Sequence, residues 1–204
     1  MSLHAIKEYA KYRIDAKTMH GVHSPFVYAF IEEILCLKVD IKKNVPARLQ
    51  NIKLSASLKR GSAIINILHH YNIKLYAILY TFEDMDLCRF KVITGPNDYV
   101  PAVCEEEFKI GRAEWVVKDK MVMGLLDISG YTGNWLEVFD KYQVLLSSNS
   151  IIIVNMIHNS PTNTQRWNEL IKSDKVRLSI DLYHFGLLFF REEFKEKQHF
   201  VLKY

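Results

Sequence analysis

The chain contains 204 residues, 49% of them hydrophobic, and its 27 basic and 23 acidic side chains leave a net charge of +4. This length and composition allow one domain with a substantial core, and the interspersed charges exclude the clustered basic face of a nucleic-acid-binding protein. No apolar run approaches the length of a membrane-spanning helix, and three widely spaced cysteines favour reduced core thiols of a cytoplasmic protein over a disulfide framework or a zinc site.

Residues 1–72 are expected to form a helical extension that packs on the core. A first helix is indicated by the helical spacing of Leu3, Ile6, Ala10 and Ile14. Ser24-Pro25 predicts the start of a second helix, because serine favours the N-cap and proline the first helical position. We expect this second helix to bury Phe26, Phe30 and Ile34 against the core or a second subunit. Two further helices are expected at residues 46–58 and 62–70.

Residues 73–204 are expected to form one α/β domain, because strand-like and helix-like segments alternate along this part of the chain. The expected strands are residues 73–80, 90–94, 115–117, 121–127, 150–157, 176–183 and 185–191, and residues 199–204 add a last strand or a tail. The expected helices are residues 98–108, residues 135–146 and a segment that begins at Pro161. The pattern predicts a three-layer fold with a mostly parallel sheet and a C-terminal antiparallel hairpin at one edge.

Both ends of the chain resemble one family of enzymes. The closing motif, residues 179–191, reads Ser-Ile-Asp-Leu-Tyr-His-Phe-Gly-Leu-Leu-Phe-Phe-Arg, and the N-terminal motif is His20-Gly21-Val22-His23-Ser24-Pro25-Phe26-Val27. These motifs are similar to those of a family of class I S-adenosylmethionine-dependent methyltransferases with a helical N-terminal extension. The match covers residues 9–38 and 110–204 well and residues 39–109 poorly. The resemblance implies a Rossmann-like methyltransferase fold with the strand order 3-2-1-4-5-7-6.

The middle of the chain lacks what such an enzyme needs for its cofactor. In the family, the first strand ends in a glycine loop, where the backbone lies against S-adenosylmethionine and a Cβ would clash. The corresponding residues here are Tyr80, Thr81 and Phe82, and no Gly-x-Gly occurs anywhere in the chain. The family's acidic residue after the second strand has no counterpart at residues 92–96, unless Glu83 or Asp84 supplies the carboxylate.

Five residues at the expected carboxyl ends of strands are candidates for ligand binding, since open α/β sheets bind ligands at that edge. They are Tyr80, Thr81, Asp127, Asn155 and His158. Asp127 either contacts a ligand or caps the following turn. His158 either faces the same crevice or is a hydrogen-bonded structural histidine. The resemblance implies that Asn155 and Met156 replace a pair of aspartates, which removes any carboxylate metal site there.

No catalytic residue and no metal ligand is assigned. His20 and His23 have a spacing compatible with a metal site, but they lack a nearby carboxylate or thiol partner, so we interpret them as residues of the helix entry. Two functions remain. The first is a non-catalytic binding or structural module with a degenerate S-adenosylmethionine site, no cofactor, and a small molecule, a protein or a second copy as partner. The second is an active methyltransferase with an atypical cofactor loop, bound to S-adenosylmethionine.

Overall fold

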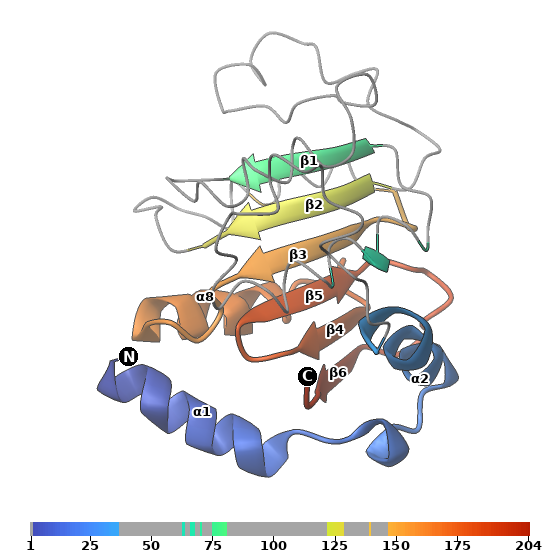
Figure 1. The fold of residues 1–204 in the computed structure, drawn as a ribbon. Helices are drawn as coiled ribbons and strands as arrows, with labels where there is room; N and C mark the ends of the chain where they lie inside the picture. The colour runs from blue at the N-terminus through green and yellow to red at the C-terminus, as the bar shows by residue number, and fades with distance from the viewer. Residues whose placement is uncertain are drawn as a thin grey trace, which may run out of the picture.

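The computed structural model describes residues 2–36, 63, 66, 67, 70, 75–80, 122–128, 139 and 147–204 (Figure 1). Its helical elements are α1 (Leu3–Asp15), the 3-10 turn η1 (Met19–Gly21), α2 (Pro25–Phe30), the π-helical η2 (Ile31–Leu35) and α8 (Pro161–Leu170). Its strands are β1 (Leu75–Tyr80), β2 (Val122–Asp127), β3 (Ile151–Asn155), β4 (Leu178–Asp181), β5 (Phe185–Phe189) and β6 (Gln198–Val201). The expected boundary at residue 72, the helices at 46–58 and 98–108, and the strands at 90–94 and 115–117 lie outside the described residues.

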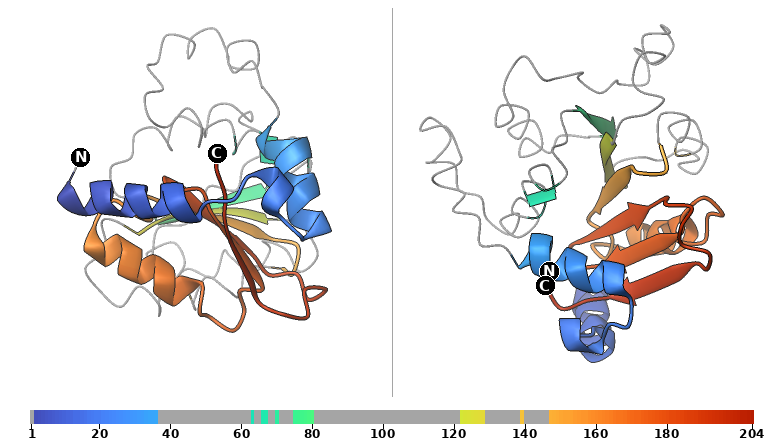
Figure 2. Two further views of the ribbon diagram at one scale, coloured as in Figure 1. Left: turned by 90° about the horizontal axis from the view of Figure 1, so that it is seen from below. Right: turned by 90° about the vertical axis from the view of Figure 1, so that its right-hand side faces the viewer.

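The described strands form one mixed sheet in the order β1-β2-β3-β5-β4-β6. β2 is parallel to β1 and to β3, and β6 is parallel to β4, whereas β5 runs antiparallel to both β3 and β4. The expected three-layer fold with a mostly parallel sheet is therefore wrong. Two of the five strand pairings are antiparallel. Of the described helices, α2 and α8 pack on strands β3, β5 and β4, whereas α1 lies beside β6 (Figure 2).

The hairpin of β4 and β5 is not at the edge of the sheet, which corrects a second expectation. β6 pairs with the outer side of β4, from Leu178 with Gln198 to Asp181 with Val201. Local sequence patterns predict a hairpin, but they do not predict which later segment returns to cover its unpaired backbone groups.

β3 is the central, fully buried strand that its run of aliphatic residues predicts. Ile151 and Ile153 belong to the main core cluster together with residues of α2 and η2. In that cluster Phe30 and Ile34 are buried, and the half-buried ring of Phe26 lies edge-on to Phe189 with 5.4 Å between centroids. The expected burial of the second helix is therefore confirmed, with Phe26 only partly enclosed.

α8 begins where the Ser-Pro pair predicts. The Ser160 Oγ accepts a hydrogen bond from the backbone N–H of Asn163 at 3.1 Å, and Pro161 occupies the first turn. Trp167 and Leu170 are buried, and the indole of Trp167 lies against Gly186 of β5. Because successive residues of a strand face opposite sides, Gly186 lies on the face opposite the core cluster that contains Phe185 and Leu187.

α1 lies beside β6 (Figure 1), and the side chains of its apolar stripe are exposed. Leu3, Ile6 and Ile14 are 84%, 51% and 83% exposed. The buried face instead carries Ala5, Tyr12 and Ala16, and the Tyr12 hydroxyl donates a hydrogen bond to the Leu202 carbonyl at 2.5 Å. The apolar spacing thus predicts the helix correctly, but small residues and a tyrosine form its packed face.

Candidate functional site

The carboxyl ends of β1, β2 and β3 bring three of the five candidate residues to one edge of the sheet. Tyr80 is the last residue of β1 and pairs with Leu126, and Asp127, the last residue of β2, pairs with Asn155 at the end of β3. Thr81 lies outside the described residues. Adjacent parallel strands end at the same edge, so backbone register alone makes Tyr80, Asp127 and Asn155 neighbours there.

Asn155 is enclosed by the fold at the end of β3. It is buried, and its other strand neighbour is Phe185 of β5. A neutral amide at this place can donate and accept hydrogen bonds, but it is a poor substitute for a carboxylate toward a hard cation. Across the described residues, no group of three or more His, Cys, Asp and Glu side chains is arranged to hold a metal ion.

His158 follows β3 in a turn and is engaged within the fold. Its Nε2 lies 2.7 Å from the Asp181 Oδ2 at the end of β4. Both side chains are nearly enclosed, with exposed fractions of 11% for His158 and 6% for Asp181. Asp181 Oδ1 also accepts the backbone N–H of Tyr183 at 2.8 Å. Since a carboxylate only accepts, His158 Nε2 carries the proton of this hydrogen bond.

The other ring nitrogen of His158 faces α1 and α8. Nδ1 lies 3.4 Å from the Thr164 Oγ1 and 3.9 Å from the Glu8 Oε2. Thr164 Oγ1 is in turn 3.0 Å from the His4 Nε2, and the ring of Tyr183 stacks on His158 with 5.7 Å between centroids. We call His4, Glu8, His158, Thr164, Asp181 and Tyr183 the His158 cluster. It joins α1, α8 and β4 through polar contacts.

The turn that carries His158 is held by two hydrogen bonds to the backbone of Met156. Met156 has a positive φ of 60°, its N–H donates to the His184 carbonyl at 3.0 Å, and its carbonyl accepts from the Asn163 Nδ2 at 2.8 Å. A left-handed backbone conformation is unfavourable for a residue with a Cβ, and these hydrogen bonds stabilise the turn against that cost. The chain leaves β3 sharply and enters α8 at Ser160.

The chemistry open to the His158 cluster is limited by α1. A carboxylate, an imidazole and a hydroxyl in sequence resemble the relay that activates a nucleophile. Here the Thr164 hydroxyl also contacts His4, and the Tyr183 hydroxyl donates to the Ala5 carbonyl at 2.6 Å. Burial raises the pKa of the Tyr183 phenol, so it stays a donor at neutral pH. The cluster therefore positions α1, and His158 acts there as a positioning residue.

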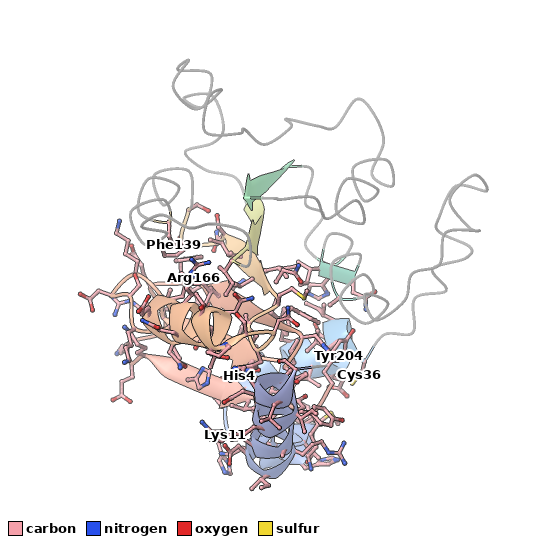
Figure 3. All side chains as sticks on the ribbon, turned by 90° about the vertical axis from the view of Figure 1, so that its left-hand side faces the viewer. His4, Lys11, Cys36, Phe139, Arg166 and Tyr204 are labelled. Carbon is pink, nitrogen blue, oxygen red and sulfur yellow. The ribbon has the colours of Figure 1, made fainter. Side chains whose placement is uncertain are left out.

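Two contributors to this region were missed from sequence. Arg166 of α8 donates a hydrogen bond to the Ile128 carbonyl, which places a guanidinium directly after Asp127 (Figure 3). Asp181 is the partner of His158. The sequence did contain a signal for Asp181, because an aspartate between Ile180 and Leu182 in a buried strand requires a hydrogen-bond donor. No local sequence feature identifies Arg166, because its role depends on a tertiary contact between α8 and the end of β2.

The remaining candidates do not assemble into a site. His20 and His23 are both exposed, and α2 is held to the core by its apolar side chains and not by these histidines. Cys36 is an exposed free thiol, so the expectation of a core thiol is wrong for it, and Cys88 and Cys104 lie outside the described residues. Of the helices that the structure describes, none has the length and apolar character needed to cross a membrane.

Comparisons with protein-family models, curated proteins and solved structures found no match to this chain. The resemblance to the methyltransferase family therefore rests on the residues quoted above.

Proposed function

We propose that the protein is a non-catalytic binding or structural module, related in sequence to S-adenosylmethionine-dependent methyltransferases, whose S-adenosylmethionine site has degenerated. The observation that carries the proposal is the edge where Tyr80, Asp127 and Asn155 end three adjacent parallel strands. In the related enzymes this edge holds the cofactor on a glycine loop. Here β1 ends at Tyr80 and the sequence continues with Thr81-Phe82, so residues with side chains replace the glycines that the cofactor site of the related enzymes needs.

The size of the expected defect follows from the missing contacts. A buried ribose hydroxyl without a partner costs about 1–3 kcal/mol, and every 1.4 kcal/mol is tenfold in affinity. A micromolar site that loses two such contacts falls to a Kd of roughly 0.1–10 mM. No cofactor is therefore assigned. The proposed partner is a small molecule or a protein, and a homodimer is compatible with the proposal.

Calorimetric titration with S-adenosylmethionine and with S-adenosylhomocysteine tests the proposal. We expect no saturation below about 0.1 mM for either compound. A Kd below about 10 µM, or S-adenosylmethionine that co-purifies with the protein, contradicts it. A thermal-shift screen of nucleosides, nucleotides and amino acids then identifies ligands that bind at this edge. A ligand of the edge should no longer stabilise the Asp127→Ala variant.

An active methyltransferase with an atypical loop is the alternative. The adjacency of Asp127 and Asn155 favours it, since the family places an aspartate at the end of the same strand. Under this alternative S-adenosylmethionine binds, and Asp127→Ala abolishes binding and methyl transfer. Under the module, neither the parent nor Asp127→Ala binds S-adenosylmethionine, and if the edge binds no other ligand the substitution changes stability alone. We also propose a cytoplasmic location, because an exposed free thiol such as Cys36 persists in a reducing compartment.

A further inference from the structure

The outer face of α1 carries a row of aliphatic side chains that does not belong to the core clusters of the described residues. We call Leu3, Ile6, Ala10 and Ile14 the α1 outer stripe. Its three large members are more than half exposed, and Ala10 is exposed as well. Isolated apolar side chains on a surface are normal, but a contiguous row along one helix marks an interaction site.

The stripe is presented rigidly, because the inner face of α1 is fixed at both ends. Tyr183 donates to the Ala5 carbonyl near the start of the helix, and Tyr12 donates to Leu202 near its end. The rings of Tyr9, Tyr12 and Tyr183 pack together, with Tyr9 and Tyr183 4.9 Å apart. A helix held in this way cannot rotate its stripe inward, and a preorganised face loses less entropy when a partner binds.

The width of the stripe indicates what kind of surface it fits. With 3.6 residues per turn, its four positions fall within an arc of about 80°, narrower than the face of about 100° or more with which a helix packs on a core. A narrow seam is typical of helix-on-helix packing, whereas a helix that lies in a membrane surface immerses a broader apolar face.

The charges beside the stripe indicate the partner's chemistry. Lys7 and Lys11 lie along one flank and Arg13 along the other, and all three are exposed (Figure 3 labels Lys11). Of the two acidic residues in α1, Glu8 is directed at His158 and Asp15 is the last residue of the helix. A second copy would bring the same three cations against each other, so self-pairing through this face is electrostatically unfavourable.

We propose that the α1 outer stripe is a docking seam for an acidic amphipathic helix of another protein. The partner helix lays aliphatic side chains at heptad spacing between the stripe residues, and its flanking carboxylates face Lys7, Lys11 and Arg13. This surface lies on the far side of α1 from the His158 cluster and does not depend on the proposed ligand edge at β1–β3.

Two lactam-stapled helical peptides of equal length test the proposal. Both carry leucine at the seam positions, and they differ in having glutamate or lysine at the flanking positions. Fluorescence anisotropy on the full chain should give the glutamate peptide an affinity at least about tenfold higher, and this preference should fall in about 0.5 M salt. Ile6→Ser should weaken binding about tenfold, since a seam loses affinity when a central apolar anchor is removed.

Charge reversal provides the sharper control. Lys7→Glu combined with Lys11→Glu should reverse the preference toward the lysine peptide, whereas Lys175→Glu with Lys195→Glu, two exposed lysines outside α1, should leave it unchanged. Equal affinity for the two peptides, or no binding of the glutamate peptide, overturns the proposal. The proposal is also overturned if neither peptide binds and the protein instead binds vesicles with about 30% phosphatidylserine in a way that depends on Ile6. A dimer in sedimentation equilibrium that Ile6→Ser dissociates identifies a second copy as the occupant and also overturns it.

Discussion

The indole of Trp167 lies directly over Gly186, so that a Cβ on Gly186 would come within 2.3 Å of Trp167 Cη2 and 2.6 Å of Cζ3. The ring belongs to α8 and is buried, and the glycine is the second residue of β5, the strand between β3 and β4. Glycine is therefore required at this position for a reason of space, since it lets α8 approach the sheet closely.

Gly186→Ala should destabilise the protein by about 1–3 kcal/mol, because a buried rigid ring must move to admit the methyl group. Urea unfolding measures the change. Gly21→Ala is the matched control, since a Cβ there meets the Lys17 side chain at an ordinary 3.4 Å. Adding Trp167→Leu to Gly186→Ala should cost less than the sum of the two single changes. Strict additivity, or a Gly186→Ala protein as stable as the parent, would show that the close packing is absent.

Phe30→Ala should lower the free energy of unfolding by about 3–5 kcal/mol. The side chain is buried in the main core cluster, 5.3 Å from the Phe189 ring, so its removal leaves a cavity between α2 and β5. Ile14→Ala removes a large side chain from an exposed position and should change stability by less than about 0.5 kcal/mol. A melting temperature unaffected by Phe30→Ala would mean that α2 is not part of the cooperative unit.

Met156→Gly should leave the protein as stable as the parent or stabilise it by up to about 1 kcal/mol. Its φ of 60° suits glycine, and the relief of that backbone strain offsets the partial burial lost from a residue that is already 39% exposed. Tyr183→Gly tests the contrast, since φ is 68° there too, but the side chain is buried and hydrogen-bonded. That change should destabilise by several kcal/mol, at least about 3. Equal effects from both substitutions, measured by thermal unfolding, would contradict this account.

How far the sequence determines this fold differs from element to element. β3 was predictable because the four consecutive aliphatic residues Ile151–Val154 are typical of a buried strand, and α8 was predictable because Ser160 and Pro161 act locally. The orientation of α1 was not predictable, because apolar spacing identifies one face of a helix but does not determine which face packs against the rest of the protein. The parallel pairing of β6 with β4 depends on register between segments about 20 residues apart, which no local pattern specifies.

The candidate site shows the same limit. Asp127 and Asn155 could be placed together because both end strands of a parallel pair. The pairing of His158 with Asp181 joins a turn to a different strand, and sequence offers only the requirement that a buried aspartate finds a donor. Side-chain partners across elements are set by packing, and the packing was mispredicted together with the sheet.

Stability should fall steeply at alkaline pH. Burial raises the pKa of Tyr12, and it raises the pKa of Tyr204 from 10.0 to about 12. Between these values the unfolded state loses protons that the folded state keeps, so the stabilisation is complete below pH 10 and is lost as pH rises toward about 12. Urea unfolding across this range should show the decline, and Tyr204→Phe should make it shallower. A Tyr204→Phe protein with the parent's slope would contradict the assignment.

His158→Ala should cost about 2–4 kcal/mol, because it leaves the buried Asp181 carboxylate with the Tyr183 N–H but without the imidazole donor. Asp181→Asn keeps the shape and removes the charge, so the double variant should be more stable than the sum of the two single losses by at least about 1 kcal/mol. Glu8→Gln should cost only about 0.2–1 kcal/mol, since Glu8 approaches His158 no closer than 3.9 Å. Amide hydrogen exchange should report faster opening of α1 in His158→Ala than in the Asp181→Asn double variant. The opposite result is that the losses in unfolding free energy of His158→Ala and Asp181→Asn add up in the double variant, with α1 exchanging at the parent's rate in both His158→Ala and the double variant; this result would show that His158 does not hold α1 through Asp181.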